Sequence, residues 1–284
     1  MGNLLNGLWV AHIFARRFRR RVCVNWADFN AAFVSTKPEI QSACERAAAT
    51  MRAPTPTVPH ARAWNFGATD TLSAINATFG SAHQLVAFDG NDWPGPVWPR
   101  ESMHQLFFDN YAPTASLQAL LPSSCTGPAG LLGPACGPNR VLHLRLGDTT
   151  KDRRGVFRCR RPYDSIKAAF ALRNYTILAD REEVYQKLAM HKTGPVFHTS
   201  GLASWAEWVA IVTARDAVFH TPSGFSESAI RVSRGHATGG LTAGRLLYGC
   251  DSSKGVKVGS ETFDPPYTRW HKDDAPAAPS PQIL

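Results

Sequence analysis

The second half of the chain alternates short apolar runs with longer segments in which apolar residues recur at helical spacing. The apolar runs predict strands at residues 141–146, 174–179, 196–198 and 217–220. The segments of helical spacing predict helices at residues 163–173, 181–190, 202–214 and 225–234. Strands that alternate with helices in this way imply a parallel sheet with right-handed crossovers, as in a Rossmann-like half.

The first half has a less regular pattern. Residues 4–20 predict an amphipathic helix that ends in arginines, where positive charge complements the helix dipole. Residues 21–26 alternate polar and apolar side chains, which predicts a strand directly after that helix. A helix followed at once by a strand is part of an α/β unit, so the first strand of this half is missing from the chain. Later segments predict a strand at 84–88 and helices at 101–109 and 114–121.

Local composition indicates where the two halves divide. Residues 123–139 are rich in Gly, Pro and Ser and predict a linker. We therefore expect one Rossmann-like half at residues 1–122 and a second at residues 140–271. Ala and Pro dominate residues 272–284, which predicts a disordered tail. The expected fold class is α/β, with two Rossmann-like halves built on parallel sheets.

Composition adds a preference for anionic partners. Hydrophobic residues make up 44% and charged residues 19%, as in an ordinary globular protein. The chain has 31 basic and 22 acidic residues, a net charge of +9, which favours nucleic acid, anionic lipid or phosphorylated small molecules. No apolar run approaches the ~20 residues that cross a bilayer, so we expect no membrane span in this chain.

The six cysteines are too scattered for a disulfide scaffold, and no CxxC pair suggests a zinc site. Cys125 and Cys136 flank a loop that is rich in Gly and Pro. A disulfide between them is expected in an oxidising compartment, whereas two buried free thiols explain their positions equally well.

Residues 141–148, with the sequence VLHLRLGD, carry the clearest chemical signal. His143 and Arg145 lie two positions apart on the predicted strand, so they share one face, while the leucines share the other. A guanidinium in a core strand is costly unless it emerges at the ligand-binding end of the sheet, where it can donate two hydrogen bonds to a diphosphate. The alternative is an edge strand with a solvated face, on which Arg145 pairs with Asp148.

His143, Arg145 and Asp148 form an H-x-R-x-x-D pattern. This pattern resembles the donor-site motif shared by the α1,2-, α1,6- and protein O-fucosyltransferases. The single arginine, followed by Leu146 and Gly147, looks closest to the protein O-fucosyltransferase version, because the α1,6 enzymes usually carry two consecutive arginines.

Two other segments resemble this superfamily in the order that it requires. Residues 1–8 resemble the end of its amino-terminal G-x-x-N loop, in which Asn3 would reach the donor sugar; alternatively, Asn3 caps the following helix. Residues 205–220 resemble the helix and strand of its last motif. The turn that follows offers amides and hydroxyls that suit phosphate groups, at Ser223, Gly224, Phe225 and Ser226.

The resemblance implies a GT-B fold and a metal-independent, inverting glycosyltransferase that moves fucose from GDP-fucose to a glycan or protein hydroxyl. The N-terminal half would face the acceptor, and the C-terminal half would bind the GDP-sugar donor through His143, Asp148 and residues 223–226. Asn3 of the N-terminal half would also contact the donor. Arg145 would also bind the donor and would be the catalytic residue, because it stabilises the charge of the departing GDP. Members of this superfamily usually work in the secretory pathway, in compartments such as the Golgi, behind a membrane anchor that this sequence does not contain.

Missing motifs narrow the chemistry further. The chain has no D-x-D triplet, which weighs against a divalent cation at the diphosphate, so neither a metal site nor a cofactor is expected. Asp92, Glu101 and Glu207 are possible general bases, and none of them is assigned.

Two alternative functions remain open. The first is a non-catalytic nucleotide-sugar or glycan-binding module, derived from a degenerate transferase. The second is a basic nucleic-acid-binding protein. Because the sequence has no aromatic–basic repeat and no recognition-helix motif, nucleic acid is not an expected partner.

Overall fold

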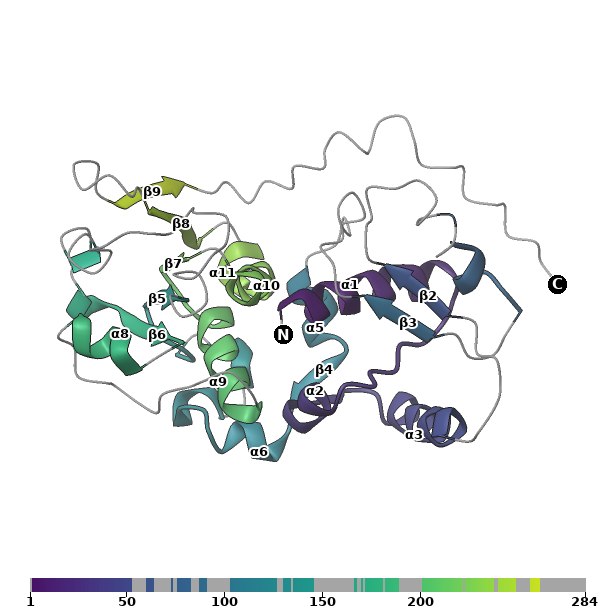
Figure 1. Ribbon diagram of the computed structural model, residues 1–284. Coiled ribbons are helices and arrows are strands. Elements are labelled where there is room, and N and C mark those ends of the chain that lie inside the picture. Colours follow the sequence, from purple (N-terminus) through teal and green to yellow (C-terminus); the bar gives the residue numbers. More distant parts are fainter. Residues whose placement is uncertain are drawn as a thin grey trace.

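The computed structural model describes residues 2–52, 60–63, 73, 76–82, 87–90, 103–126, 130–133, 135–145, 166–167, 170, 172–180, 182–188, 201–221, 223–237, 240–248 and 256–260. Within these residues the chain is mixed α/β (Figure 1). The strand predicted at 196–198 and the tail predicted at 272–284 lie outside the described residues.

A five-stranded sheet forms the centre of the C-terminal part, in the order β6-β5-β7-β8-β9. Its strands are β5 (Arg140–Leu144), β6 (Thr176–Ala179), β7 (Ala217–His220), β8 (Thr242–Tyr248) and β9 (Val256–Ser260). The first four strands in this order are parallel, and β9 is antiparallel to β8. The predicted parallel sheet is therefore confirmed, and β8 and β9 extend it beyond the strands that the sequence pattern predicts.

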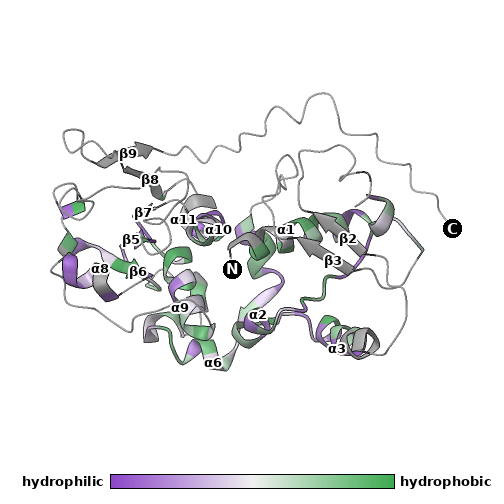
Figure 2. Cartoon of the chain, in the orientation of Figure 1, coloured by the Kyte–Doolittle hydropathy of each residue, from purple (hydrophilic) through white to green (hydrophobic). Residues whose placement is uncertain are grey.

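Helices cover both faces of this sheet. They are α8 (Glu182–Lys187), α9 (Gly201–Val212), α10 (Gly224–Val232) and the short α11 (Arg234–Ala237). The cluster formed by α9 and α10 includes Val141, whereas the cluster formed by α8 includes Leu142 and Leu144. Figure 2 shows much hydrophobic colour on α9 and mostly hydrophilic colour on α8, which matches a more deeply buried α9.

Burial on both faces corrects one expectation for β5. The alternative of an edge strand with a solvated face is wrong, because β5 lies between β6 and β7 and His143 is only 5% exposed. In a parallel sheet the crossover helices pack on both faces, so the strands between them are buried on both sides. Only the end of the strand is open, and Arg145 is exposed there.

Strand β6 forms an outer edge of the described sheet. Just beyond the end of β6, the Asp180 N–H donates a hydrogen bond to the Leu144 carbonyl of β5 at 3.2 Å. On the other side of β6, the Tyr185 hydroxyl accepts the Ala179 N–H at 3.1 Å and donates to the Ile177 carbonyl at 3.0 Å. Burial is the main cause that raises the pKa of Tyr185 to about 12, so the hydroxyl keeps its proton and both hydrogen bonds.

The N-terminal part consists of helices and two small sheets. Its helices are α1 (Gly2–Arg17), α2 (Ala27–Ala32), α3 (Pro38–Arg52), α5 (Met103–Phe108) and α6 (Ala115–Gln118). The two-stranded sheets pair β1 (Phe33–Ser35) antiparallel with β4 (Tyr111–Pro113), and β2 (His60–Ala63) parallel with β3 (Ala87–Gly90).

The helices predicted at 4–20, 101–109 and 114–121 are therefore confirmed as α1, α5 and α6, which are shorter than expected. The strand predicted at 84–88 forms as β3, two or three residues further along. Residues 21–26 are extended but join no strand among the described residues, so the strand predicted there is wrong. Their half-buried apolar side chains pack directly against the core, which produces the strand-like alternation without a sheet.

An aromatic core joins the N-terminal and C-terminal parts. The Trp205 ring centroid lies 5.6 Å from that of Phe29 and 5.2 Å from that of Phe33. Trp208, one turn further along α9, lies 5.2 Å from Phe107. Fully burying side chains of this kind contributes about 2–3 kcal/mol each. One continuous core therefore extends across the predicted linker, and the division of the chain into two halves stays a prediction.

Two disulfides link parts of the chain that lie close in sequence. They join Cys23 to Cys44 and Cys125 to Cys136. The second bridge decides between the two interpretations of Cys125 and Cys136. Cys159 and Cys250 lie outside the described residues.

The predicted linker is folded where the structure describes it. It contains the short 3-10 helices η1 (Ser123–Cys125) and η2 (Gly130–Leu132). Gly137 has a φ of 84° and lies so close to Thr213 that a Cβ atom at this position would collide with it. The segment therefore packs against the end of α9. No helix among the described residues is long and apolar enough to cross a membrane.

Candidate functional site

The ends of three strands meet at the carboxyl edge of the five-stranded sheet. The Arg145 N–H donates to the Thr221 hydroxyl at 2.7 Å, and the Thr221 N–H donates to the His143 carbonyl at 3.0 Å. The chain leaves β5 toward β6 on one side and leaves β7 toward β8 on the other. Such a reversal of strand order opens a crevice between two neighbouring strand ends, which is where ligands bind in open α/β sheets.

The turn after β7 leads into α10 and is held by its own serines. The Ser223 side chain caps the helix by accepting the Phe225 N–H at 3.3 Å. The Ser226 hydroxyl donates to the Ser223 carbonyl at 3.1 Å and lies 2.9 Å from Nδ1 of His220. The N-terminus of α10 therefore lies close to Arg145 along the chain of hydrogen bonds through Thr221, and the helix end adds partial positive charge there.

His143 lies beneath this turn. Its ring stacks on Phe225 with a centroid distance of 5.5 Å and an interplanar angle of 30°. Burial, reinforced by the nearby His220 and Arg145, lowers the pKa of His143 to about 3. The imidazole is therefore neutral at physiological pH. Its Nδ1 atom is buried without a hydrogen-bond partner among the described residues.

Arg145 directly follows the last residue of β5. The four preceding residues of β5 are buried, whereas the Arg145 side chain is exposed where the strand ends. Its main chain is hydrogen-bonded to Thr221, so the guanidinium starts beside the turn at 221–226. A guanidinium that emerges next to a helix N-terminus favours an anion.

Glu207 is a site residue that the sequence analysis named only as one of several possible bases. It is the single charged residue of the apolar helix α9, which is the signal that sets it apart. Glu207 is 6% exposed, and its Oε1 atom has no hydrogen-bond partner among the described residues. Burial, reinforced by the charge of Asp180 at the end of β6, raises the pKa of Glu207 to about 9. At neutral pH it is a protonated carboxyl group that can both donate and accept a hydrogen bond.

The remaining predicted residues are placed only in part. Asn3 belongs to the first turn of α1, which begins at Gly2, so it lies in the helix and not in a loop before it. Helix α1 packs against α10, and Figure 1 shows the start of the chain beside α10. Gly224 is the first residue of α10. Asp148 lies outside the described residues, as do Asp92 and Glu101.

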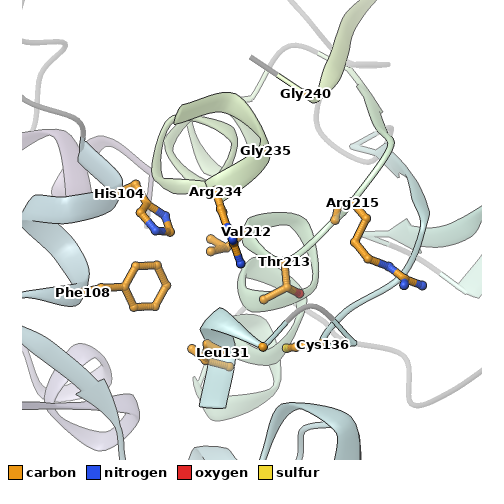
Figure 3. A pocket seen from close by; sticks show the side chains of 12 residues that line it. His104, Phe108, Leu131, Cys136, Val212, Thr213, Arg215, Arg234, Gly235 and Gly240 are labelled. Carbon is orange, nitrogen blue, oxygen red and sulfur yellow. The ribbon is translucent and has the colours of Figure 1, made fainter. Parts of the chain in front are cut away.

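A separate cleft of about 230 Å³ lies at the opposite, amino-terminal edge of the sheet (Figure 3). Figure 3 shows Arg234 between His104 and Thr213, whereas the Arg215 side chain points away and donates to the Asn139 side chain. Both arginines lie just beyond the C-terminal ends of α10 and α9, where the helix dipole is negative. The C-terminal ends of these two helices offset part of the positive charge of the arginines.

The carboxyl edge thus brings together His143, Arg145, Ser223, Phe225 and Ser226, with Glu207 and Asp180 beside them. Among the described residues no group of three or more His, Cys, Asp or Glu side chains is arranged to hold a metal ion. Neither the protein-family models nor the curated proteins that were searched match this chain.

Proposed function

We propose that the chain is a glycosyltransferase of the GT-B type that moves fucose from GDP-fucose to a glycan or protein hydroxyl, with inversion and without a metal ion. The observation that carries this proposal is the meeting of Arg145 with the serine-rich turn at 221–226. The Arg145 main chain is hydrogen-bonded to Thr221, and Ser223 caps α10 two residues later, so the arginine and the first turn of α10 lie side by side. This pairing suits a diphosphate.

The chemistry follows from where the charge develops. As the bond between fucose and GDP breaks, negative charge grows on the diphosphate, and Arg145 with the α10 amides stabilises that charge. His143 is neutral and stacked on Phe225, so its part is to orient the nucleotide through a hydrogen bond and not through charge. Glu207 offers a second buried hydrogen-bonding group to the same ligand.

The two disulfides support the location that the resemblance implies. Disulfides persist in the secretory pathway and are rare in the cytosol, where thiols are kept reduced. Cys23–Cys44 and Cys125–Cys136 are therefore consistent with a transferase of the Golgi or the endoplasmic reticulum.

A thermal-shift panel tests the donor directly. We expect GDP and GDP-fucose to raise the melting temperature more than UDP-sugars or NAD at the same concentration. A ligand at a hundredfold excess over its Kd adds about 2.7 kcal/mol to the free energy of unfolding. Equal shifts for all these anions would contradict the donor assignment.

Release of GDP from GDP-fucose then separates a transferase from a binding module. A transferase releases GDP, faster when acceptor glycans or protein acceptors are added. A chain that is stabilised selectively by GDP-fucose but never releases GDP would instead be a nucleotide-sugar-binding module.

A further inference from the structure

Residues 21–25 form an extended strip between α1 and α2 (Figure 1). The odd-numbered side chains of the strip are exposed, whereas Val22 and Val24 are half-buried and pack against the aromatic core. This is the geometry of a β-strand that lies on a core with one face. Yet no strand among the described residues pairs with the strip.

The main chain of the strip is open to a partner. In the described part of the molecule, none of the N–H groups of residues 21–25 donates a hydrogen bond. The Val24 carbonyl accepts one from the Asn30 side chain at 2.9 Å. A row of exposed donors and acceptors in an extended conformation is a template on which another chain can add a strand.

The strip is also held in place at several points. Just before it, the Arg20 guanidinium donates to the carbonyls of Phe79 at 2.6 Å and Ser81 at 2.5 Å. In its middle, Cys23 is bonded to Cys44 of α3. Just after it, the Trp26 ring lies 5.3 Å from Trp205. Because the extended shape exists before a partner arrives, binding costs little conformational entropy on this side of the interface.

The positive charge beside the strip favours a partner strand that carries acidic side chains. Arg17, Arg19 and Arg21 are exposed, and none of them forms an ion pair in the part of the chain that the structure describes. Exposed charges on an open edge discourage pairing with neutral or basic strands. The same charges attract a strand that carries carboxylates.

We propose that residues 17–25 form a docking surface for an extended, acidic segment of another protein, which adds as a strand alongside residues 21–25. This surface is independent of the proposed transferase activity and lies on a different part of the molecule from Arg145 and α10.

A peptide titration with hydrogen exchange tests the proposal. The probe is a short peptide of alternating glutamate and valine, and the controls are its lysine counterpart and a copy with every second backbone amide methylated. We expect the acidic peptide to bind and to slow exchange of the amides of residues 21–25 by about tenfold or more. The lysine peptide should not bind, and the methylated peptide should bind much more weakly, because it cannot pair its main chain.

A matched pair of variants locates the binding surface. Arg21→Glu should weaken binding of the acidic peptide by about fivefold or more. Lys167→Glu makes the same change of charge at an exposed position elsewhere and should leave the affinity unchanged. Unchanged exchange at residues 21–25, or equal binding of the methylated peptide, would overturn strand addition. Tighter binding of an anionic polysaccharide or an oligonucleotide that also displaces the peptide would overturn the choice of a protein partner.

Discussion

The two edges of the C-terminal sheet both carry exposed arginines, and they differ in the helix ends that meet them. At the carboxyl edge, Arg145 stands beside the N-terminus of α10, so guanidinium and helix dipole have the same sign. At the amino edge, Arg215 and Arg234 follow the C-termini of α9 and α10, so guanidinium and dipole have opposite signs.

The two edges also differ in whether their buried polar groups have hydrogen-bond partners. Near the carboxyl edge, Nδ1 of His143 and Oε1 of Glu207 are buried and have no hydrogen-bond partner among the described residues. At the amino edge, the His104 ring has a partner in the Val232 carbonyl at 2.7 Å, and the Thr213 hydroxyl donates to the Val209 carbonyl at 2.7 Å. The comparison teaches that the number of arginines does not identify an anion site. What matters is whether the helix end beside the arginine carries charge of the same sign or of the opposite sign.

Replacing Arg145 tests this comparison most strongly. Arg145→Ala removes the guanidinium beside the N-terminus of α10, so release of GDP from GDP-fucose should fall by about a thousandfold, or ~4 kcal/mol of transition-state stabilisation. The melting temperature should hardly change, because the side chain is exposed. Arg234→Ala is the matched control and should keep normal turnover. Similar losses in both variants would abolish the distinction between the two edges.

The pH dependence of stability tests the buried carboxyl group of the carboxyl edge. The pKa of Glu207 is about 9 in the folded protein against 4.5 for the ordinary group, so the folded state holds a proton that the unfolded state releases. The contribution of this proton to the free energy of unfolding is fully present below pH ~4.5. This contribution is lost as pH rises through ~9, by up to about 1.4 kcal/mol per pH unit.

Glu207→Gln should remove that slope. Denaturant titrations should find the variant gaining stability relative to the wild type as pH rises from 5 to 9, with a constant difference below pH ~4.5. Glu182→Gln, at an exposed position on α8, is the control and should keep the wild-type slope. A wild-type slope in the Glu207 variant would mean that this carboxyl group is ionised in the folded protein.

The cap of α10 allows a smaller and more selective test. Ser223→Ala should cost about 1 kcal/mol of stability, because the Phe225 N–H loses its acceptor. Thr114→Ala removes the equivalent cap of α6, where Thr114 accepts the Leu117 N–H at 3.3 Å, and should cost a similar amount. Only the Ser223 variant should also show a smaller thermal shift with GDP, since only that helix end faces the crevice.

The smallest expected effect belongs to the amino edge. Arg234→Ala removes a positive charge from the end of α10 and should lower stability by about 0.5 kcal/mol at low salt. Added salt should reduce this difference, because it screens exposed charges. A difference that persists at high salt would point to a packing role for the Arg234 side chain.

The sequence predicted the C-terminal sheet well because its strands are continuous apolar runs separated by helices with one apolar face. It also assigned Arg145 and residues 223–226 to positions that follow parallel strands, which end at the same edge of a sheet. It could not predict that β5 and β7 are neighbours with opposite crossovers, because strand order depends on long-range packing. That order is what brings Arg145 and Thr221 within hydrogen-bonding distance.

The first part of the chain was harder to predict for a related reason. Residues 21–26 have the alternation of a strand, but periodicity reports only which side chains are buried and not what covers them. Here the covering groups are aromatic rings of α2 and α9, which come from positions far apart in the sequence. Glu207 illustrates the same limit, because its raised pKa results from burial and from Asp180, neither of which the local sequence contains.

Tyr185 has a consequence for the behaviour of the protein in concentrated solution. Its phenol takes the place of a neighbouring strand along β6, since it occupies both the N–H of Ala179 and the carbonyl of Ile177. A second molecule cannot join the sheet edge to edge there without displacing a buried ring. Tyr185 thus disfavours edge-to-edge association of two molecules through the described edge of β6.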